Sequence, residues 1–136
     1  MRIVLDTNVI ASAIFFGGKP KEVVDLLMND KTDCFATVEI FEEYMETVEY
    51  LREKYSKNAP RLPLFDIESK ITLIESKSKL NVCRDPDDNK FIECALDAKC
   101  YYIVSGDKDL LDVKKHKSVQ IVTVSEFLDL FNHYSN

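Results

Sequence analysis

Four acidic residues stand where local structure alone does not require them, namely Asp6, Glu43, Asp88 and Asp107. An all-carboxylate set suits a hard divalent cation such as Mg²⁺ or Mn²⁺, because zinc sites draw on histidine and cysteine. Four carboxylates brought together would repel one another unless a cation were bound. A bound ion of this kind can orient water, lower the pKa of that water and stabilise charge on a phosphodiester. The residues therefore predict metal-assisted hydrolysis of a phosphate ester.

Asp6 and Asp107 follow segments that have the composition of buried strands. The apolar run RIVL directly precedes Asp6, and YYIV ends three residues before Asp107. In an open parallel sheet, ligands bind outside the carboxyl ends of the strands, so the two carboxylates are expected to meet at one crevice. The alternative is that each aspartate only caps the helix that follows it. The presence of both aspartates favours a site.

A long helix is predicted from residue 38 to residue 55, and it carries many glutamates. One row of them is expected to face solvent, opposite an apolar stripe, and consists of Glu42, Glu46, Glu49 and Glu53. Glu43 departs from this row and lies at the edge of the apolar stripe. A carboxylate that leans toward the core needs a partner, because burying it unpaired is costly. A basic side chain and a metal ion are the two alternatives.

The stretch CRDPDDNKFIECA combines the start of a helix with another candidate ligand. Asp85 before a proline is typical of an N-cap, and Asp87 in the first turn suits the helix dipole. Asp88 shares its helix face with Ile92, which is expected to point into the core. We therefore expect Asp85 to be the cap and Asp88 to be the ligand.

Strands alternate with helices along the chain. Strands are predicted at residues 2–5, 34–37, 80–83, 101–104 and 118–124. Helices are predicted at residues 8–15, 21–28, 38–55, 66–78, 87–98 and 125–134. Gly17-Gly18 is expected to end the first helix, Pro20 to open the second and Ser125 to cap the last. A loop is predicted at residues 56–65 and a short helical turn after Asp107. This order predicts an α/β three-layer sandwich with a central, mostly parallel sheet of about four or five strands flanked by helices. At 136 residues, the chain is expected to form one domain, residues 1–136.

Composition limits the classes of protein. The net charge of −6 argues against a protein that coats nucleic acid through a general basic excess. No apolar run approaches the ~20 residues that span a bilayer, and the N-terminus lacks a signal-peptide pattern, so we expect a cytoplasmic protein with no membrane contact. The four cysteines lack metal-site or disulfide spacing and are expected to be reduced core residues.

Four motifs together resemble the PIN domain nucleases. They are LDTNV, TVEIFEEY, DDNKFIECALDA and YYIVSGDKDLL, and they occur in the family's order and approximate spacing. Each motif alone is weak, whereas the ordered set is fairly specific and covers essentially the whole chain. The sequence looks most like the compact prokaryotic members, many of which are toxins of the VapC type in toxin–antitoxin pairs.

The resemblance implies a Mg²⁺- or Mn²⁺-dependent endoribonuclease, a hydrolase that cuts RNA. It also implies a homodimer and, for a toxin, an antitoxin that blocks the site. The four acids named above would hold the metal and its activated water. Thr7, Asn8 and Ser105 would supply polar support. Asp109 would be a fifth acid, and an equally good interpretation makes it a solvent-facing acid.

RNA must still reach an acidic protein. Candidate contacts to RNA phosphates are Lys19, Lys21, Arg52 and Lys108. The run KKHK at residues 114–117 is the densest positive patch, although surface lysines often have no ligand. An alternative function is a non-catalytic or weakly catalytic PIN-fold module that binds nucleic acid or protein.

Overall fold

A mostly parallel sheet forms the centre of the molecule. The structure is a computed structural model that describes residues 1–55 and 63–135. Its strands are β1 (Arg2–Leu5), β2 (Asp33–Ala36), β3 (Ile71–Leu73), β4 (Tyr102–Val104), β5 (Lys115–His116) and β6 (Val119–Val122). They lie in the order β3-β2-β1-β4-β6-β5, and only β5 is antiparallel to its neighbour within this described sheet. The predicted α/β architecture is confirmed, with six strands instead of four or five.

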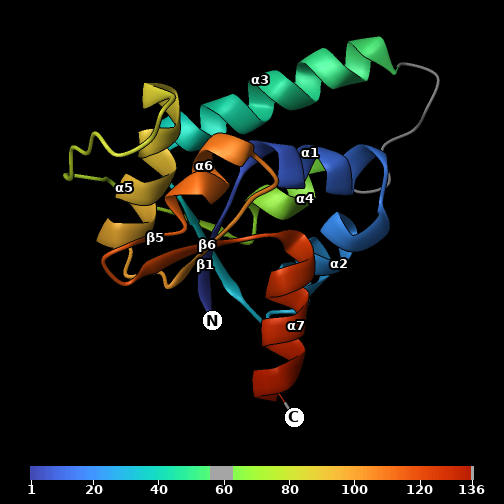
Figure 1. The fold of residues 1–136 in the computed structure, drawn as a ribbon. Helices are drawn as coiled ribbons and strands as arrows, with labels where there is room; N and C mark the ends of the chain where they lie inside the picture. Colours follow the sequence, from blue (N-terminus) through green and yellow to red (C-terminus); the bar gives the residue numbers. More distant parts are fainter. Residues whose placement is uncertain (56–62, 136) are drawn as a thin grey trace.

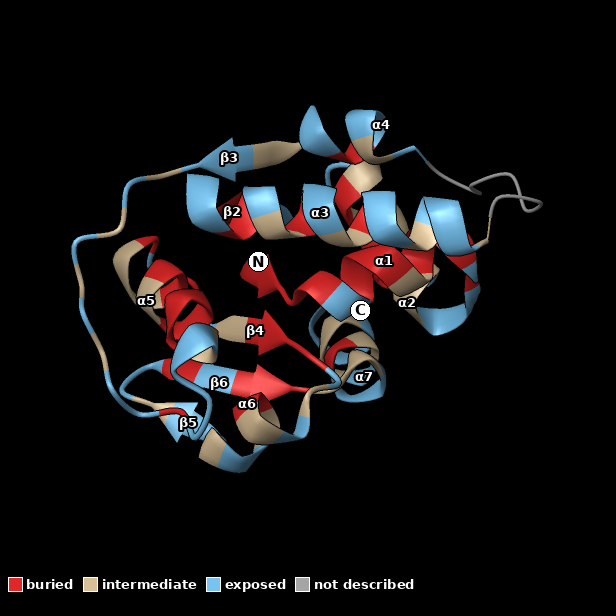
Figure 2. Cartoon of the chain, turned by 90° about the horizontal axis from the view of Figure 1, so that it is seen from above, coloured by how far each residue is buried: buried red, intermediate tan, exposed pale blue. Residues whose placement is uncertain are grey.

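Helices cover both faces of the sheet. They are α1 (Thr7–Phe15), α2 (Gly18–Met28), α3 (Val38–Lys54), α4 (Leu64–Glu68), α5 (Asn89–Asp97), α6 (Lys108–Val113) and α7 (Val124–Ser135), with a 3₁₀ turn, η1 (Pro86–Asp88), before α5. In Figures 1 and 2, α5 lies on one face, α1, α2 and α7 lie on the other, and α3 crosses one end of the sheet. Among the described residues, no helix is both long and apolar enough to cross a membrane.

The sheet has its topological switch point between β1 and β4. From β1 the chain goes to β2 and β3 on one side, and it returns to β4 and β6 on the other. β1 is central, and its residues Ile3, Val4 and Leu5 are fully buried, as expected for a strand covered on both faces. A crevice for a ligand is expected outside the carboxyl ends of these two strands, where Asp6 and Asp107 stand.

The long helix α3 is fixed across the end of β1 by one tyrosine. Tyr44 is fully buried, and its hydroxyl donates a hydrogen bond to the carbonyl oxygen of Leu5, the last residue of β1. The predicted glutamate row is exposed, and Ile40 and Val48 lie buried beside Tyr44. Because Glu43 immediately precedes Tyr44, this anchor places the Glu43 carboxylate near Asp6.

The helix predicted at residues 66–78 is wrong beyond its first turn. α4 ends at Glu68, and residues 71–73 form β3, which pairs with β2. Ile67, Ile71 and Ile74 have helical spacing, but the run ITLI, which is rich in β-branched residues, also suits a strand. Pairing with the open edge of β2 favours the strand over the helix. Of the loop predicted at residues 56–65, residues 56–62 lie outside the described part of the chain.

The strand predicted at residues 80–83 is also wrong, because side chains of α5 take its backbone donors. Asn89, Glu93 and Asp97 stand four residues apart on α5, so they form one row along the helix. Their side-chain oxygens accept hydrogen bonds of 2.5–3.1 Å from the loop, whose donors are the backbone N–H groups of Lys77, Ser78, Leu80, Val82 and Cys83 and the hydroxyls of Ser76 and Ser78. We call this row the α5 acceptor row. It satisfies the backbone donors of an irregular loop, whereas a strand would need a neighbouring strand to satisfy them.

The cap predicted for the last helix lies two residues earlier. The hydroxyl oxygen of Thr123 accepts a hydrogen bond from the N–H of Glu126, and the Glu126 carboxylate accepts one from the N–H of Thr123. This reciprocal pair is a capping box, which satisfies two donors where a lone serine cap satisfies one. The hydroxyl of Ser125 lies 3.3 Å from Lys19 Nζ instead.

We predict that Asp97→Ala lowers the free energy of unfolding by about 1–3 kcal/mol, because hydrogen bonds to a charged acceptor are lost and loop donors are left without a partner. Urea denaturation of the full chain measures this change. Asp129→Ala, at an exposed position of α7, is the matched control and is expected to shift stability by less than about 0.5 kcal/mol. Equal effects of the two substitutions would contradict the role given to the α5 acceptor row.

Candidate metal centre

A polar cavity of about 300 Å³ opens at the carboxyl ends of β1 and β4. Its lining residues are Asp6, Thr7, Asn8, Glu43, Thr47, Asp85, Asp88 and Asp107. The structure thus brings together all four acids that the sequence singled out, from segments up to about a hundred residues apart. Thr7 is buried and Asn8 is exposed at the edge of the cavity.

Asp6 occupies the N-cap position of α1, but its side chain is held by Ser105. Its Oδ2 accepts a hydrogen bond of 2.6 Å from the hydroxyl of Ser105, which is fully buried, and its side chain makes no cap hydrogen bond to α1. The same serine oxygen accepts a hydrogen bond of 2.9 Å from the backbone N–H of Asp107. The Asp107 side chain makes no cap hydrogen bond to α6 either. Ser105 therefore ties the two aspartates together, and capping through the side chain explains neither of them.

Glu43 has the basic partner that the sequence left as one of two alternatives. Its Oε1 lies 2.6 Å from Nζ of Lys90, and its Oε2 accepts a hydrogen bond from the hydroxyl of Thr7. Nζ of Lys90 also lies 2.9 Å from Oδ2 of Asp87. Burial alone would lower the pKa of Lys90, but the hydrogen bonds that its ammonium donates to Glu43 and Asp87 outweigh burial and raise that pKa.

Sequence reasoning did not single out Lys90. The signal was present, because Lys90 lies four residues before Cys94 on the same helical face, and Cys94 is fully buried. A lysine on the buried face of a helix needs an acidic partner.

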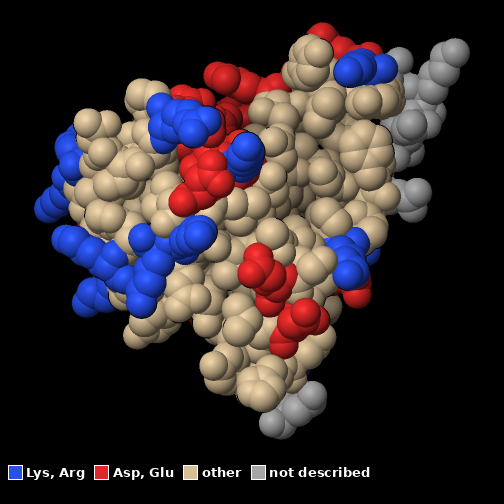
Figure 3. Space-filling model, viewed as in Figure 1, with Lys and Arg blue, Asp and Glu red and all other residues tan. Residues whose placement is uncertain are grey.

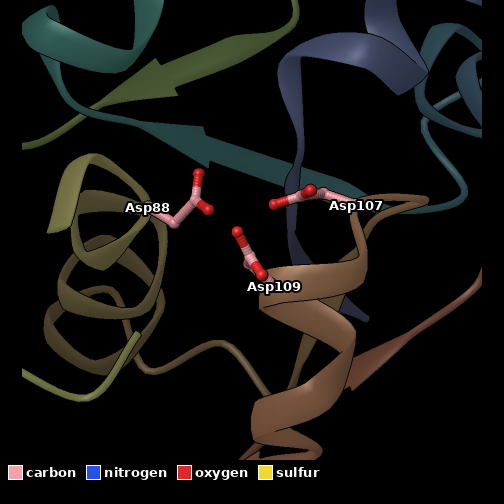
Figure 4. Close-up of side chains that lie close together, drawn as sticks. All are labelled: Asp88, Asp107 and Asp109. Atoms are coloured by element: carbon pink, nitrogen blue, oxygen red, sulfur yellow. The ribbon is translucent and has the colours of Figure 1, made fainter. Parts of the chain in front are cut away.

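Three aspartates come closest together. Asp88 at the end of η1 and Asp107 and Asp109 at the start of α6 each offer a carboxylate oxygen, and these oxygens lie within 4.8 Å of one another. Figure 4 shows their side chains pointing toward one another across the gap between α5 and α6. Asp109 thus faces the cluster, and it also lies 4.0 Å from Nε of Arg84. Asp85 is the N-cap as predicted, accepting a 3.0 Å hydrogen bond from the N–H of Asp87.

The pKa values at the cavity report crowded negative charge. Burial, a hydrogen bond with Asp107 and repulsion from Asp107 and Asp85 raise the pKa of Asp88 from 3.8 to about 7. Burial raises the pKa of Asp6 as well, with Asp107 and Glu43 adding repulsion, although the hydrogen bond from Ser105 opposes the shift. Raised carboxyl pKa values at these two neighbouring groups mean that a cation would be bound favourably here.

The donor set fits a hard divalent cation. The three aspartates supply oxygen ligands, and no histidine or cysteine joins the described cluster. Mg²⁺ and Mn²⁺ prefer such ligands, and Mg²⁺ is commonly held by one or two carboxylates together with water. The centre could therefore hold a metal ion at Asp88, Asp107 and Asp109, with Asp6 beside them.

The candidate RNA contacts differ in their surroundings. Lys19 lies near Ser125 as described above, Lys21 pairs with Asp25 at 3.0 Å, and Arg52 lies 3.9 Å from Glu49. Lys108 is exposed and stands directly after Asp107. Figure 3 shows acidic side chains gathered near α3 and basic side chains gathered on the side of α5 and β5.

The sequence comparisons agree with this fold. The sequence pattern of the PIN domain family matches residues 2–109, a span that includes Asp6, Glu43, Asp88, Asp107 and Asp109. The chain belongs to the PIN domain family, which confirms the resemblance and places it in a nuclease superfamily. It is also 30% identical to the uncharacterized protein MJ1680 of Methanocaldococcus jannaschii, over 98% of this chain and 94% of that protein.

We predict that the metal-free protein loses stability as the pH rises from about 4 to about 7. The folded chain keeps a proton on Asp88 up to about pH 7, whereas the unfolded chain releases it near the ordinary value of 3.8. The folded state therefore binds more protons in this interval, and its stability falls as the pH increases. Thermal unfolding in EDTA between pH 4 and pH 8 measures this slope.

Asp88→Asn is expected to remove this contribution and to raise the Tm above pH 7 in EDTA. Asp129→Asn, on the exposed face of α7, is the control and should leave the slope unchanged. A wild-type slope that survives in Asp88→Asn would contradict the assignment to Asp88.

Proposed function

We propose that the protein is a divalent-metal-dependent endoribonuclease. The observation that carries the proposal is the convergence of Asp88, Asp107 and Asp109 beside the buried Asp6 in a chain of the PIN domain family. When bound, Mg²⁺ or Mn²⁺ would lower the pKa of a coordinated water and offset negative charge on the phosphodiester. The remaining chemistry belongs to the side chains that place the ion, the water and the RNA.

The acids of the site and the polar residues that hold them receive separate roles in this proposal. Asp88 and Asp107 hold the ion, with Asp6 and Asp109 completing the acidic side of the cavity. Ser105 fixes the Asp6 carboxylate and the backbone before α6, so the two strand-end acids keep their relative position. Glu43, oriented by Thr7, faces the reacting phosphate and water from the α3 side. Asn8 is exposed at the mouth and offers an amide to the substrate.

RNA would approach through the basic side chains near this acidic cavity. Lys108 is the first of them, because it is exposed, directly follows Asp107 and makes no ion pair with any residue in the described ranges. Lys19, Lys21 and Arg52 already have partners within the chain, so they would have to exchange these for phosphate. Lysines 114, 115 and 117 follow α6 directly along the chain and add further positive charge after Lys108.

The biological setting we propose follows the compact prokaryotic PIN proteins. The enzyme would act in the cytoplasm as the toxin of a toxin–antitoxin pair, as a homodimer whose site an antitoxin protein blocks. Support comes from the spread of the resemblance over the chain. Light scattering on the purified chain alone would give the mass of a dimer. With the product of a neighbouring small reading frame added, it would give the mass of a complex. A monomer that forms no complex would contradict this setting.

We predict that the wild type cuts a labelled, mixed RNA pool with Mn²⁺ or Mg²⁺ and not with EDTA. Asp6→Asn keeps the shape of the side chain but removes its charge, so it is expected to reduce the cutting rate by at least about 100-fold, because losing even an outer partner of a metal ligand typically costs 10–100-fold. Gel analysis of the cleaved pool measures both rates.

Two further variants make the assay specific. Asp129→Asn should cut like the wild type, since this residue is exposed on α7, away from the cavity. Lys108→Glu should raise KM more than it lowers kcat, because it opposes phosphate binding and replaces none of the acids in the cluster. Equal cutting by the wild type and Asp6→Asn, or none by either, would remove the support for catalysis and favour the binding-module function.

A further inference from the structure

Lys90 places a buried positive charge at the edge of the acidic cavity. Its residue surface is only 7% exposed, although lysine is usually a surface residue. A buried ammonium is costly unless acids surround it closely. Lys90 meets this condition through Glu43 at 2.6 Å and Asp87 at 2.9 Å.

The contacts divide the acids of the cavity into two groups. On one side, which we call the lysine side, both oxygens of Glu43 already face donors, Lys90 and Thr7. On the other, which we call the aspartate side, the carboxylates of Asp88 and Asp107 make no ion pair with any Lys or Arg that the structure describes. The protein thus supplies a close, buried positive charge on the lysine side, whereas on the aspartate side only the exposed Arg84 approaches, at 4.0 Å from Asp109.

This asymmetry bears on how many ions the site can hold. Two-metal phosphodiesterases keep their ions about 3.5–4 Å apart, each held by carboxylates. A second ion on Glu43 would lie beside the ammonium that already contacts the same carboxylate at 2.6 Å. Two like charges on one carboxylate repel, and the ammonium cannot leave cheaply because it is buried.

We propose that Lys90 serves as a permanent cation on the lysine side, so that the centre takes one divalent ion, on the aspartate side, and Glu43 keeps its ion pair. This inference rests on the proposed function, since it concerns the ion that the nuclease would use. Lys90 is a positioning residue, because it acts through Glu43. Asp87 also gains a role, since it holds the ammonium from its solvent-facing side.

Counting bound Mn²⁺ tests the inference directly. Equilibrium dialysis of the full chain against Mn²⁺ is expected to give one ion per wild-type chain. Lys90→Met removes the ammonium and leaves Glu43 and Asp87 without their partner, so this variant is expected to bind two. Electron paramagnetic resonance should then show the spin coupling of two nearby Mn²⁺ ions in the variant alone. Lys70→Met, which removes the exposed ion pair with Asp30, is the control and should stay at one ion.

The possible results separate this inference from the proposed function. Two ions on the wild type, or a single ion in Lys90→Met, would overturn the inference and leave the nuclease proposal standing. No ion on the wild type would overturn both. If Lys90→Met does not fold, Lys90→Gln, which keeps a hydrogen-bond donor without the charge, takes its place. A single ion in that variant would overturn the inference.

Discussion

Negative charge at the carboxyl ends of β1 and β4 is the constraint on which the rest of this structure depends. Asp6, Glu43, Asp88 and Asp107 line one cavity, and burial together with repulsion from neighbouring aspartates raises the pKa of Asp88. The protein offsets part of this repulsion with fixed donors, a buried serine hydroxyl on Asp6 and a buried ammonium on Glu43. What remains unneutralised lies on the aspartate side, which is where a cation is needed.

The scaffold around the cavity fixes each acid from a different direction. Tyr44 fastens α3 to the end of β1 and so places Glu43. Ser105 joins the ends of β1 and β4. The α5 acceptor row holds the irregular loop that leads into Asp85 and η1, and so it fixes where Asp88 enters the cavity. A rigid arrangement of this kind lets an ion bind without the cost of ordering its ligands.

Family membership and geometry contribute different parts of the account. Membership of the PIN domain family assigns a nuclease superfamily. The geometry adds an asymmetry that the family assignment does not contain, because Glu43 is engaged by Lys90 and Thr7 whereas the aspartates face one another. In our proposal this asymmetry sets both the position and the number of the ions, and it keeps Glu43 in its ion pair with Lys90.

The sequence predicted the layered architecture and the convergence of the four acids, because the carboxyl ends of parallel strands lie at the same edge of the sheet. It failed where neighbours distant in sequence decide the outcome. Residues 71–73 became a strand because β2 has an open edge, and residues 80–83 lost their predicted strand to two side chains of α5, Asn89 and Glu93. Lys90 and Glu43 lie 47 residues apart in the sequence. The local helical pattern could therefore predict a lysine on the buried face of α5, but it could not predict which acid pairs with that lysine.

The most direct test of the metal centre is a crystal structure of the wild type soaked in Mn²⁺, with anomalous scattering recorded to locate the metal. The account predicts one anomalous peak per chain, within coordination distance of Asp88 and Asp107, with Lys90 still paired to Glu43. No peak at the cavity, or a peak on Glu43 in place of the ammonium, would contradict it.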